Sequence, residues 1–325
     1  QGKGRQMRFG TMVPQGWKMD LVGIPDDGQW DHIMATAGAI EAAGWDSLWV
    51  YDHFHTHPIV SQESTFDAWT LMAALATVTE RVRIGQMCTC VLYRPASLLG
   101  KIAVSVDAIS GGRLDVGIGA GWSHKEFAAY GYEYPSNKVR LDMLEEAAQV
   151  LKAMWTSDEA FFEGEHYTLA GAITRPKPIQ KPHPPLWIAG GGEKRTLRIV
   201  AKYGDYANFG DDLETFVHKS NVLADHCEAV GRDYGEIGRT IHMMSVIGRD
   251  RADLDAKLET AARRRGSTAA EFEEEHFVMT VDEAVDAVGG FVEAGCAEFI
   301  LYFYDMGEND SQDLFAAEVI PQLRG

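Results

Sequence analysis

Eight short runs of β-branched and aromatic residues recur along the chain, and each is followed by a stretch whose apolar residues repeat every three or four positions. Short apolar runs are typical of buried strands, and the three-to-four repeat is typical of amphipathic helices. Such alternation predicts a parallel sheet covered by helices. The candidate strands are Arg8–Val13, Ser47–Tyr51, Val82–Cys88, Arg113–Gly119, Leu186–Ala189, Tyr206–Phe209, Thr240–Ile247 and Glu298–Phe303.

The length of the chain favours closing this sheet into one barrel. It has 325 residues, whereas a (β/α)8 barrel without insertions needs about 250. We therefore predict an α/β protein with a single (β/α)8 TIM barrel over residues 7–325, with insertions at about 156–185 and about 249–277. Residues 1–6 precede Met7 and are interpreted as an extension or a cloning remnant. An open doubly wound sheet is the alternative, but no change in composition marks a second domain.

Two sequence patterns indicate where helices begin. Ser123 with Glu126 and Thr280 with Glu283 both have the spacing of a capping box, in which each side chain satisfies the other residue's backbone N–H. Each cap contributes about 1 kcal/mol and defines the first turn of its helix.

The charge of the chain excludes several classes of partner. Thirty Lys and Arg against 48 Asp and Glu give a net charge of −18, whereas nucleic acids and anionic membranes require clustered cations. No run approaches the roughly 18 apolar residues of a membrane span. The four cysteines show no paired pattern, which suits a reducing compartment. We expect a cytoplasmic enzyme that acts on a small molecule.

The end of the second candidate strand carries the sequence WVYDHF at 49–54. Barrel enzymes gather their reactive groups at the carboxyl ends of the strands, and imidazole is the side chain that exchanges protons most readily near neutral pH. Asp52 and His53 are therefore candidate site residues. The alternative is that Asp52 caps a turn and His53 is an ordinary surface residue.

Three alternating histidines, His53, His55 and His57, allow a second hypothesis for this segment. Such a pattern can bind a metal in barrel hydrolases when later strands supply further ligands. The fifth and sixth candidate strands end without histidine, although Asp305 after the eighth would fit. We expect no metal here.

Two glycine runs follow other strands. AGGGEKRT at 189–196 opens a helix after the fifth strand, where backbone N–H groups and the helix dipole favour an anion; a flexible turn is the alternative. GIGAGW at 117–122 lacks the spacing of a dinucleotide fingerprint, and close packing explains it equally well. Together the two runs suggest a large flat ligand. Cys88 and Cys90 are interpreted as wall residues, since no base accompanies them.

These segments resemble the luciferase-like monooxygenase superfamily, in its actinobacterial branch of oxidoreductases that use the deazaflavin coenzyme F420. The resemblance spans nearly the whole chain from Met7, and its most specific part is SGGR followed by GxGAGW. The Asp-His pair favours F420 over flavin. The matching segments are RFG at 8–10, WVYDHF at 49–54, RIG at 83–85, YRPA at 93–96, DAISGGRL at 107–114, GIGAGW at 117–122 and PLWIAGGG at 185–192.

The resemblance implies a site at the mouth of the barrel. The ring lies over a non-proline cis peptide between Met87 and Cys88, the glycine turn holds the phosphate, and His53 gives or takes a proton beside the hydride carbon. The cofactor-binding residues implied are Asp52, Met87, Cys88, Ala120, Gly121, Gly190, Gly191 and Gly192.

One departure from the family pattern bears on the substrate. In the sugar-phosphate dehydrogenase branch, a glutamate used in proton transfer follows the glycine segment, and here Trp122 takes its place. We therefore expect an apolar or aromatic substrate near Trp122, such as a reducible C=C, C=N or carbonyl compound. Lys194, Arg195 and Arg198 are candidates to line the path of the polyglutamate tail, or else are solvated helix charges.

The sequence thus predicts F420-dependent hydride transfer to or from an unidentified organic substrate. An FMN-dependent monooxygenase on the same fold is the alternative, and a non-catalytic cofactor-binding relative is the second. The resemblance also implies a homodimer.

Overall fold

The computed structural model describes residues 7–307 and 310–324, so the extension predicted at 1–6 lies outside the described residues. Eight parallel strands form a closed barrel, in which β1 pairs with β2 on one side and with β12 on the other. The predicted TIM barrel and all eight of its strands are confirmed. The barrel strands, in spatial order, are β1 Arg8–Met12, β2 Ser47–Val50, β3 Arg83–Gln86, β5 Leu114–Gly119, β8 Leu186–Ala189, β9 Tyr206–Asn208, β10 Gly238–Gly248 and β12 Glu298–Phe303.

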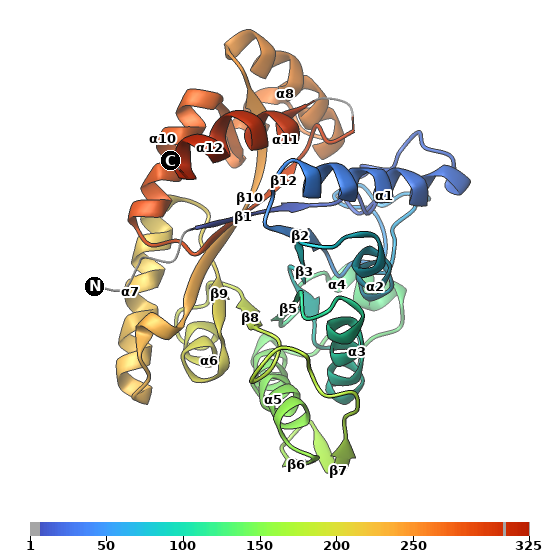
Figure 1. The fold of residues 1–325 in the computed structure, drawn as a ribbon, viewed down its shortest axis with the longest axis vertical. Helices are drawn as coiled ribbons and strands as arrows, with labels where there is room; N and C mark the ends of the chain where they lie inside the picture. Colours follow the sequence, from blue (N-terminus) through green and yellow to red (C-terminus); the bar gives the residue numbers. More distant parts are fainter. Residues whose placement is uncertain (1–6, 308–309, 325) are drawn as a thin grey trace.

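Helices surround the strands on all sides (Figure 1). In α1, the buried residues Ile33, Ala37 and Ile40 lie on the face turned to the sheet, at the spacing of an amphipathic helix. Within the part of the chain that the structure describes, no helix has the length and apolar character needed to cross a bilayer. The outer helices are α1 Asp26–Ala42, α2 Ala68–Val78, α3 Ala96–Ile109, α5 Asn137–Thr156, α6 Thr196–Tyr203, α7 Leu213–Val230, α10 Val281–Glu293, and the C-terminal run of α11 Ser311–Leu314, a π-helical turn Phe315–Val319 and α12 Ile320–Arg324.

Further elements elaborate the barrel. The segment 156–185 contains an antiparallel hairpin that forms its own two-stranded sheet beyond α5 (Figure 1), and its proline-rich part leads back to β8. The segment 249–277 is mostly helical. The additional elements are β4 Thr89–Cys90, α4 His124–Ala129, β6 Glu159–Glu163, β7 Thr168–Ile173, a 3-10 turn Tyr234–Glu236, α8 Arg251–Arg265, α9 Ala269–Glu275 and β11 Phe277–Thr280.

Only one of the two predicted capping boxes is present. Thr280 and Glu283 form the reciprocal pair at the start of α10. At the start of α4, Ser123 makes no capping hydrogen bond, so that prediction is wrong. The carboxylate of Glu126 turns instead toward His53 and Phe54 in the segment after β2, where it accepts short hydrogen bonds.

Large side chains fill the barrel at the amino end of its strands. Trp49 and Trp187 are fully buried and pack edge to face, with 4.7 Å between ring centroids. Beside them, Arg83 pairs with Asp115 at 2.6 Å. Because this end is filled, the interior opens to solvent at the carboxyl ends of the strands.

Candidate active site

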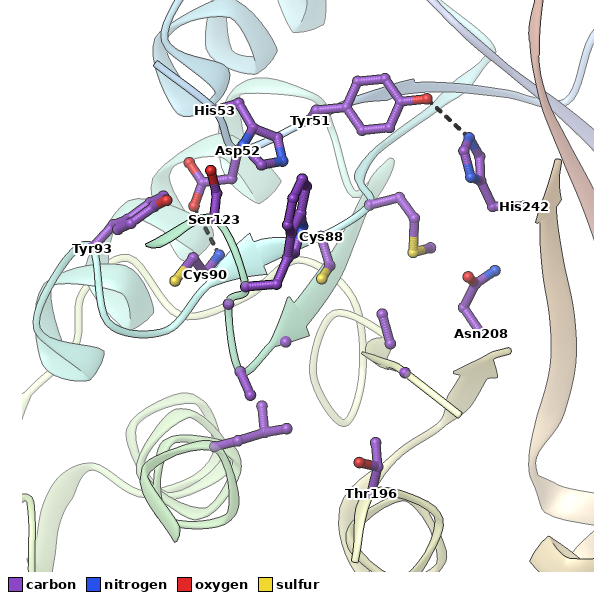
Figure 2. Close-up of a pocket in the computed structure, with 18 of the residues that line it drawn as sticks. Tyr51, Asp52, His53, Cys88, Cys90, Tyr93, Ser123, Thr196, Asn208 and His242 are labelled. Atoms are coloured by element: carbon purple, nitrogen blue, oxygen red, sulfur yellow. Dashed lines mark hydrogen bonds between the residues drawn. The ribbon is translucent and has the colours of Figure 1, made fainter. Parts of the chain in front are cut away.

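A cavity of 560 Å³ opens at the carboxyl ends of the strands. Figure 2 shows its side chains converging from the segments after β2, β3 and β5, from the start of α6, and from β9 and β10. It collects residues that are far apart in sequence, as the barrel predicts. Of the ten predicted site residues, nine line it and Gly191 lies within the same turn as two of them. The nine are Asp52, His53, Met87, Cys88, Ala120, Gly121, Trp122, Gly190 and Gly192.

His53 is held by a buried carboxylate. Its Nδ1 lies 2.6 Å from Oε2 of Glu126, which also accepts from the hydroxyl of Tyr93 at 3.1 Å, while Oε1 accepts from the backbone N–H of Phe54 at 2.9 Å. Burial opposes ionisation of Glu126, but its hydrogen bond and charge interaction with His53 and the N–H of Phe54 outweigh it and lower its pKa to about 2. The carboxylate is therefore ionised, so Nδ1 of His53 carries a proton.

The other ring nitrogen of His53 has no hydrogen-bond partner among the described residues and belongs to a side chain that lines the cavity. The ring is fixed by parallel stacking on Trp17, with centroids 3.9 Å apart and planes 4° from parallel. Trp122 meets it edge to face at 5.5 Å. His53 is thus oriented on three sides, with Nε2 left to act on a ligand.

Trp17 lies among several cationic or titratable groups. The ammonium of Lys18 sits 4.0 Å from the centroid of the Trp17 ring. Burial and the charge of Arg265 lower the pKa of Lys18 to about 7, against the opposing effect of Asp20. Burial and the charge of Lys18 lower the pKa of His57 to about 4, so His57 is neutral at physiological pH.

Asp52 is engaged within the protein. Both of its oxygens are paired with the guanidinium of Arg94, at 2.7 and 2.8 Å, and Oδ2 also accepts from the backbone N–H of Cys90 at 2.8 Å. The carboxylate is buried. The hydrogen bond from Cys90 holds the short strand β4 beside the cavity. Because both oxygens of Asp52 are already paired, the carboxylate has little capacity left to bind a ligand.

The predicted non-proline cis peptide between Met87 and Cys88 is confirmed. Burial raises the pKa of the Cys88 thiol to about 12, so it is protonated at neutral pH and is no nucleophile. A Cβ on Gly119 would lie 2.5 Å from Sγ of Cys88, and one on Gly121 would lie 2.5 Å from Sγ of Cys90. The spacing of the GxG run therefore reflects close packing against two thiols.

The glycine turn after β8 has two distinct parts. Gly190 adopts a φ of +119°, and its N–H donates to the carbonyl of Asn208 at 3.0 Å, so it extends the sheet. At Gly192, a Cβ would lie 2.8 Å from Oγ1 of Thr196, the first residue of α6. Only the later part of the turn therefore offers donors to a ligand.

Lys219, on α7, adds a positive charge to this turn. Its ammonium lies so close to Gly191 that a Cβ there would collide with it. The N–H groups of Gly191 and Gly192 have no acceptor among the described residues. Unpaired donors, the start of a helix and an ammonium together suit an anion such as a phosphate.

The three basic residues predicted along the tail path differ in their contacts. Arg195 donates to Asp142 at 2.6 Å, which ties it to α5. Lys194 and Arg198 are exposed and make no hydrogen bond or ion pair within the described ranges.

No group of three or more histidine, cysteine, aspartate or glutamate side chains in residues 7–307 and 310–324 could hold a metal ion. His53 is committed to Glu126, and His57 stacks on Trp17 at 5.4 Å. The Nδ1 of His55 lies 4.0 Å from Oε1 of the same Glu126. The alternating histidines therefore surround Glu126 and Trp17 instead of forming a metal-binding group among the described residues.

Sequence reasoning missed several residues of the site. The spacing of Glu126 from Ser123 predicts only a helix cap, and Arg94 stands out only within the YRPA motif. Trp17, Lys219 and His242 carried no local signal. Only Glu126 could have been recognised, because a carboxylate just after a glycine-ended barrel strand is placed near the mouth.

The chain matches the model of the luciferase-like monooxygenase family over residues 7–296. The F420-dependent glucose-6-phosphate dehydrogenase of Amycolatopsis mediterranei is 29% identical over 321 residues, which cover 87% of this chain and 92% of that protein. The enzyme of the same name from Kineococcus radiotolerans is also 29% identical, with 87% and 90% covered.

Two solved structures share the fold. An F420-dependent secondary alcohol dehydrogenase in complex with an F420–acetone adduct has a TM-score of 0.80 at 24% identity, with 98% of this chain and 100% of that chain covered. The coenzyme F420-dependent tetrahydromethanopterin reductase from Methanopyrus kandleri has a TM-score of 0.76 at 17% identity, with 98% and 99% covered. Because the family model covers most of its length, the chain belongs to the luciferase-like monooxygenase family, as its motifs predicted.

Proposed function

We propose that the protein is an F420-dependent oxidoreductase that transfers a hydride between the deazaflavin and an uncharged organic substrate, with His53 as the proton donor or acceptor. One observation carries the proposal. His53 is hydrogen-bonded through Nδ1 to the ionised Glu126 and lines the cavity that the glycine turn at 190–192 also borders. The motifs predict coenzyme F420, which is also the coenzyme in the names of the relatives from Amycolatopsis mediterranei and Kineococcus radiotolerans.

The residues of the cavity suit a phosphorylated tricycle. A Cβ on Gly191 would displace the ammonium of Lys219, a Cβ on Gly192 would crowd Oγ1 of Thr196, and the N–H groups of both glycines are unpaired among the described residues. These features fit a phosphate. The wall that includes Met87 and Cys88 offers apolar surface for a flat ring.

When bound, F420 supplies a carbon of its central ring that carries the hydride. The protein supplies position and a proton. Glu126 keeps a proton on Nδ1 of His53 and stabilises the imidazolium, so Nε2 can lose or gain a proton facing the substrate. Stacking on Trp17 prevents the imidazole from turning away.

The cavity favours an uncharged substrate. No lysine or arginine is among its described lining residues. A sugar phosphate, the substrate in the names of the two relatives, would need cations for its phosphate in addition to those at the glycine turn. Trp122, which is 55% exposed at the rim, instead offers a face for an apolar or aromatic group. We infer a carbonyl, imine or activated alkene as the reacting group.

Titration with purified coenzymes tests the proposal. F420 fluorescence should change saturably with the protein at micromolar concentration, and FMN should bind much more weakly. Micromolar binding of FMN with no response to F420 would contradict the proposal and favour the monooxygenase.

His53→Ala then tests the role of the imidazole. A panel of ketones, aldehydes, imines and enones is screened with reduced F420 by following reoxidation of the coenzyme. For any substrate found, the variant should bind F420 within about tenfold of the wild type and turn over about 100-fold more slowly or worse. Unchanged turnover would remove His53 from the chemistry. Tight F420 binding with no turnover across the panel would favour a non-catalytic relative.

A further inference from the structure

A second polar pair lines the cavity on β9 and β10, and the mechanism above does not use it. Asn208 ends β9 and His242 lies within β10. Asn208 is in register with Thr240, so His242 follows two residues further along the neighbouring strand. The two Cα atoms are then about 8 Å apart, from the usual rise and spacing of strands. Both side chains lie on the side of the cavity where Figure 2 shows Tyr51 reaching His242.

The hydrogen bonds around Asn208 determine which way its amide points. The hydroxyl of Thr240 donates its only proton to the carbonyl of Ala207 at 2.8 Å. Thr240 Oγ1 must therefore accept the bond from Nδ2 of Asn208 at 3.0 Å. That leaves Oδ1 of Asn208 as an acceptor on a side chain that lines the cavity.

The tautomer of His242 is fixed in a similar way. Its Nε2 lies 3.0 Å from the hydroxyl of Tyr51, which has no other acceptor among the described residues (dashed line in Figure 2). Burial raises the pKa of Tyr51, which keeps that hydroxyl protonated. Burial and the charge of Lys18 lower the pKa of His242 to about 3, which keeps the imidazole neutral. Tyr51 therefore donates to Nε2, and the proton of His242 resides on Nδ1, which has no partner among the described residues.

We propose that His242 and Asn208 form a donor–acceptor pair that recognises the amide edge of the coenzyme's pyrimidinedione ring. Nδ1–H of His242 donates to a ring carbonyl, and Oδ1 of Asn208 accepts from the adjacent ring N–H. Tyr51 is the positioning residue that holds the tautomer of His242. The inference rests on the proposed function for its ligand, a tricycle with such an edge.

Binding measurements test this pairing without any need for a substrate. Kd for F420 is measured by fluorescence in the wild type, His242→Leu, His242→Asn and Tyr51→Phe. Loss of the donor in His242→Leu should weaken binding about tenfold, and His242→Asn, which can place an N–H near the position of Nδ1, should restore most of it. Tyr51→Phe should weaken binding less. His276→Leu, at a histidine outside the cavity lining, should leave Kd unchanged.

A modified ring tests the acceptor. The 5-deazariboflavin chromophore should bind the wild type at least about tenfold more tightly than its derivative methylated at the ring N–H. In Asn208→Ala the two rings should bind with similar affinity, because the variant lacks the acceptor Oδ1 and its smaller side chain leaves space for the methyl group. Melting temperatures of all variants show whether each is folded.

The outcomes separate the two claims. If the wild type binds F420 but its Kd is the same in folded His242→Leu and Asn208→Ala, the pairing is wrong and the proposed function stands. If the wild type binds FMN and not F420, the proposed function fails, and the same titrations with FMN decide the pairing, since the two rings share this edge.

Discussion

Replacement of Glu126 by glutamine tests the most heavily bonded group of the site. In the wild type the carboxylate accepts from His53, Tyr93 and the N–H of Phe54. The carbonyl of a glutamine can still accept from the N–H of Phe54, but its NH₂ group then points at two hydrogen-bond donors, Nδ1–H of His53 and the hydroxyl of Tyr93. The variant should therefore be less stable and should hold His53 less firmly.

The size of the effect follows from the pKa of Glu126. The interactions with His53 and the N–H of Phe54 overcome burial and lower that pKa from 4.5 to about 2. Each pKa unit corresponds to 1.36 kcal/mol, so the ionised carboxylate contributes about 3 kcal/mol. Because the pKa is lowered in the folded state, this stability is fully present above about pH 4.5. It is lost as the pH falls toward 2.

Urea denaturation of the wild type and Glu126→Gln should therefore differ by about 3 kcal/mol in free energy of unfolding at pH 7, and by clearly less at pH 3. Glu133→Gln alters an exposed carboxylate in the loop after α4 and should change stability by less than about 0.5 kcal/mol at either pH. A difference between the wild type and Glu126→Gln that stays constant from pH 7 to pH 3 would refute the assignment.

Three further predictions address the rest of the cavity. Asp52→Asn breaks the buried ion pair with Arg94 and should lower the free energy of unfolding, measured in urea, by about 3–5 kcal/mol. Asp158→Asn breaks an exposed ion pair with Arg175 and should lower it by under about 1 kcal/mol. Equal losses in the two variants would contradict the role of burial. Gly191→Ala crowds Lys219 and should weaken F420 binding tenfold or more, while Gly38→Ala, in open space on α1, should not; equal affinities would place the phosphate elsewhere. Because the pKa of Cys88 is about 12, its thiolate fraction at pH 8 is about 2,000-fold smaller than that of a free thiol with a pKa near 8.5. Iodoacetamide should therefore label Cys88 far more slowly than a free thiol, as followed by mass spectrometry; labelling as fast as a free thiol would show that Cys88 is a thiolate.

The barrel could be predicted because its signal is repeated eight times along the chain. Each strand is a short apolar run, and the structure places every one of them within two residues of its expected bounds at either end. The glycines at 190–192 likewise predict a turn between a strand and a helix, where the structure has it between β8 and α6; their contact with a phosphate stays a prediction. The strands and the glycine turn are determined by residues that are adjacent in sequence.

The pairings within the site depend on residues far apart in sequence, which a local pattern cannot specify. Ser123 and Glu126 have the spacing of a capping box, yet the carboxylate binds His53, 73 residues away, because that contact is buried and charged. Tyr51 and His242 are separated by 191 residues. Such contacts follow from the closure of the barrel.

A crystal structure of the protein with F420 bound would show whether the glycine turn and His53 act on the coenzyme together. We expect the phosphate to accept hydrogen bonds from the N–H groups of Gly191 and Gly192 near the ammonium of Lys219, and Nε2 of His53 to lie beside the hydride-carrying carbon. A coenzyme bound at the opposite end of the barrel, or with its reactive carbon turned away from His53, would contradict this expectation.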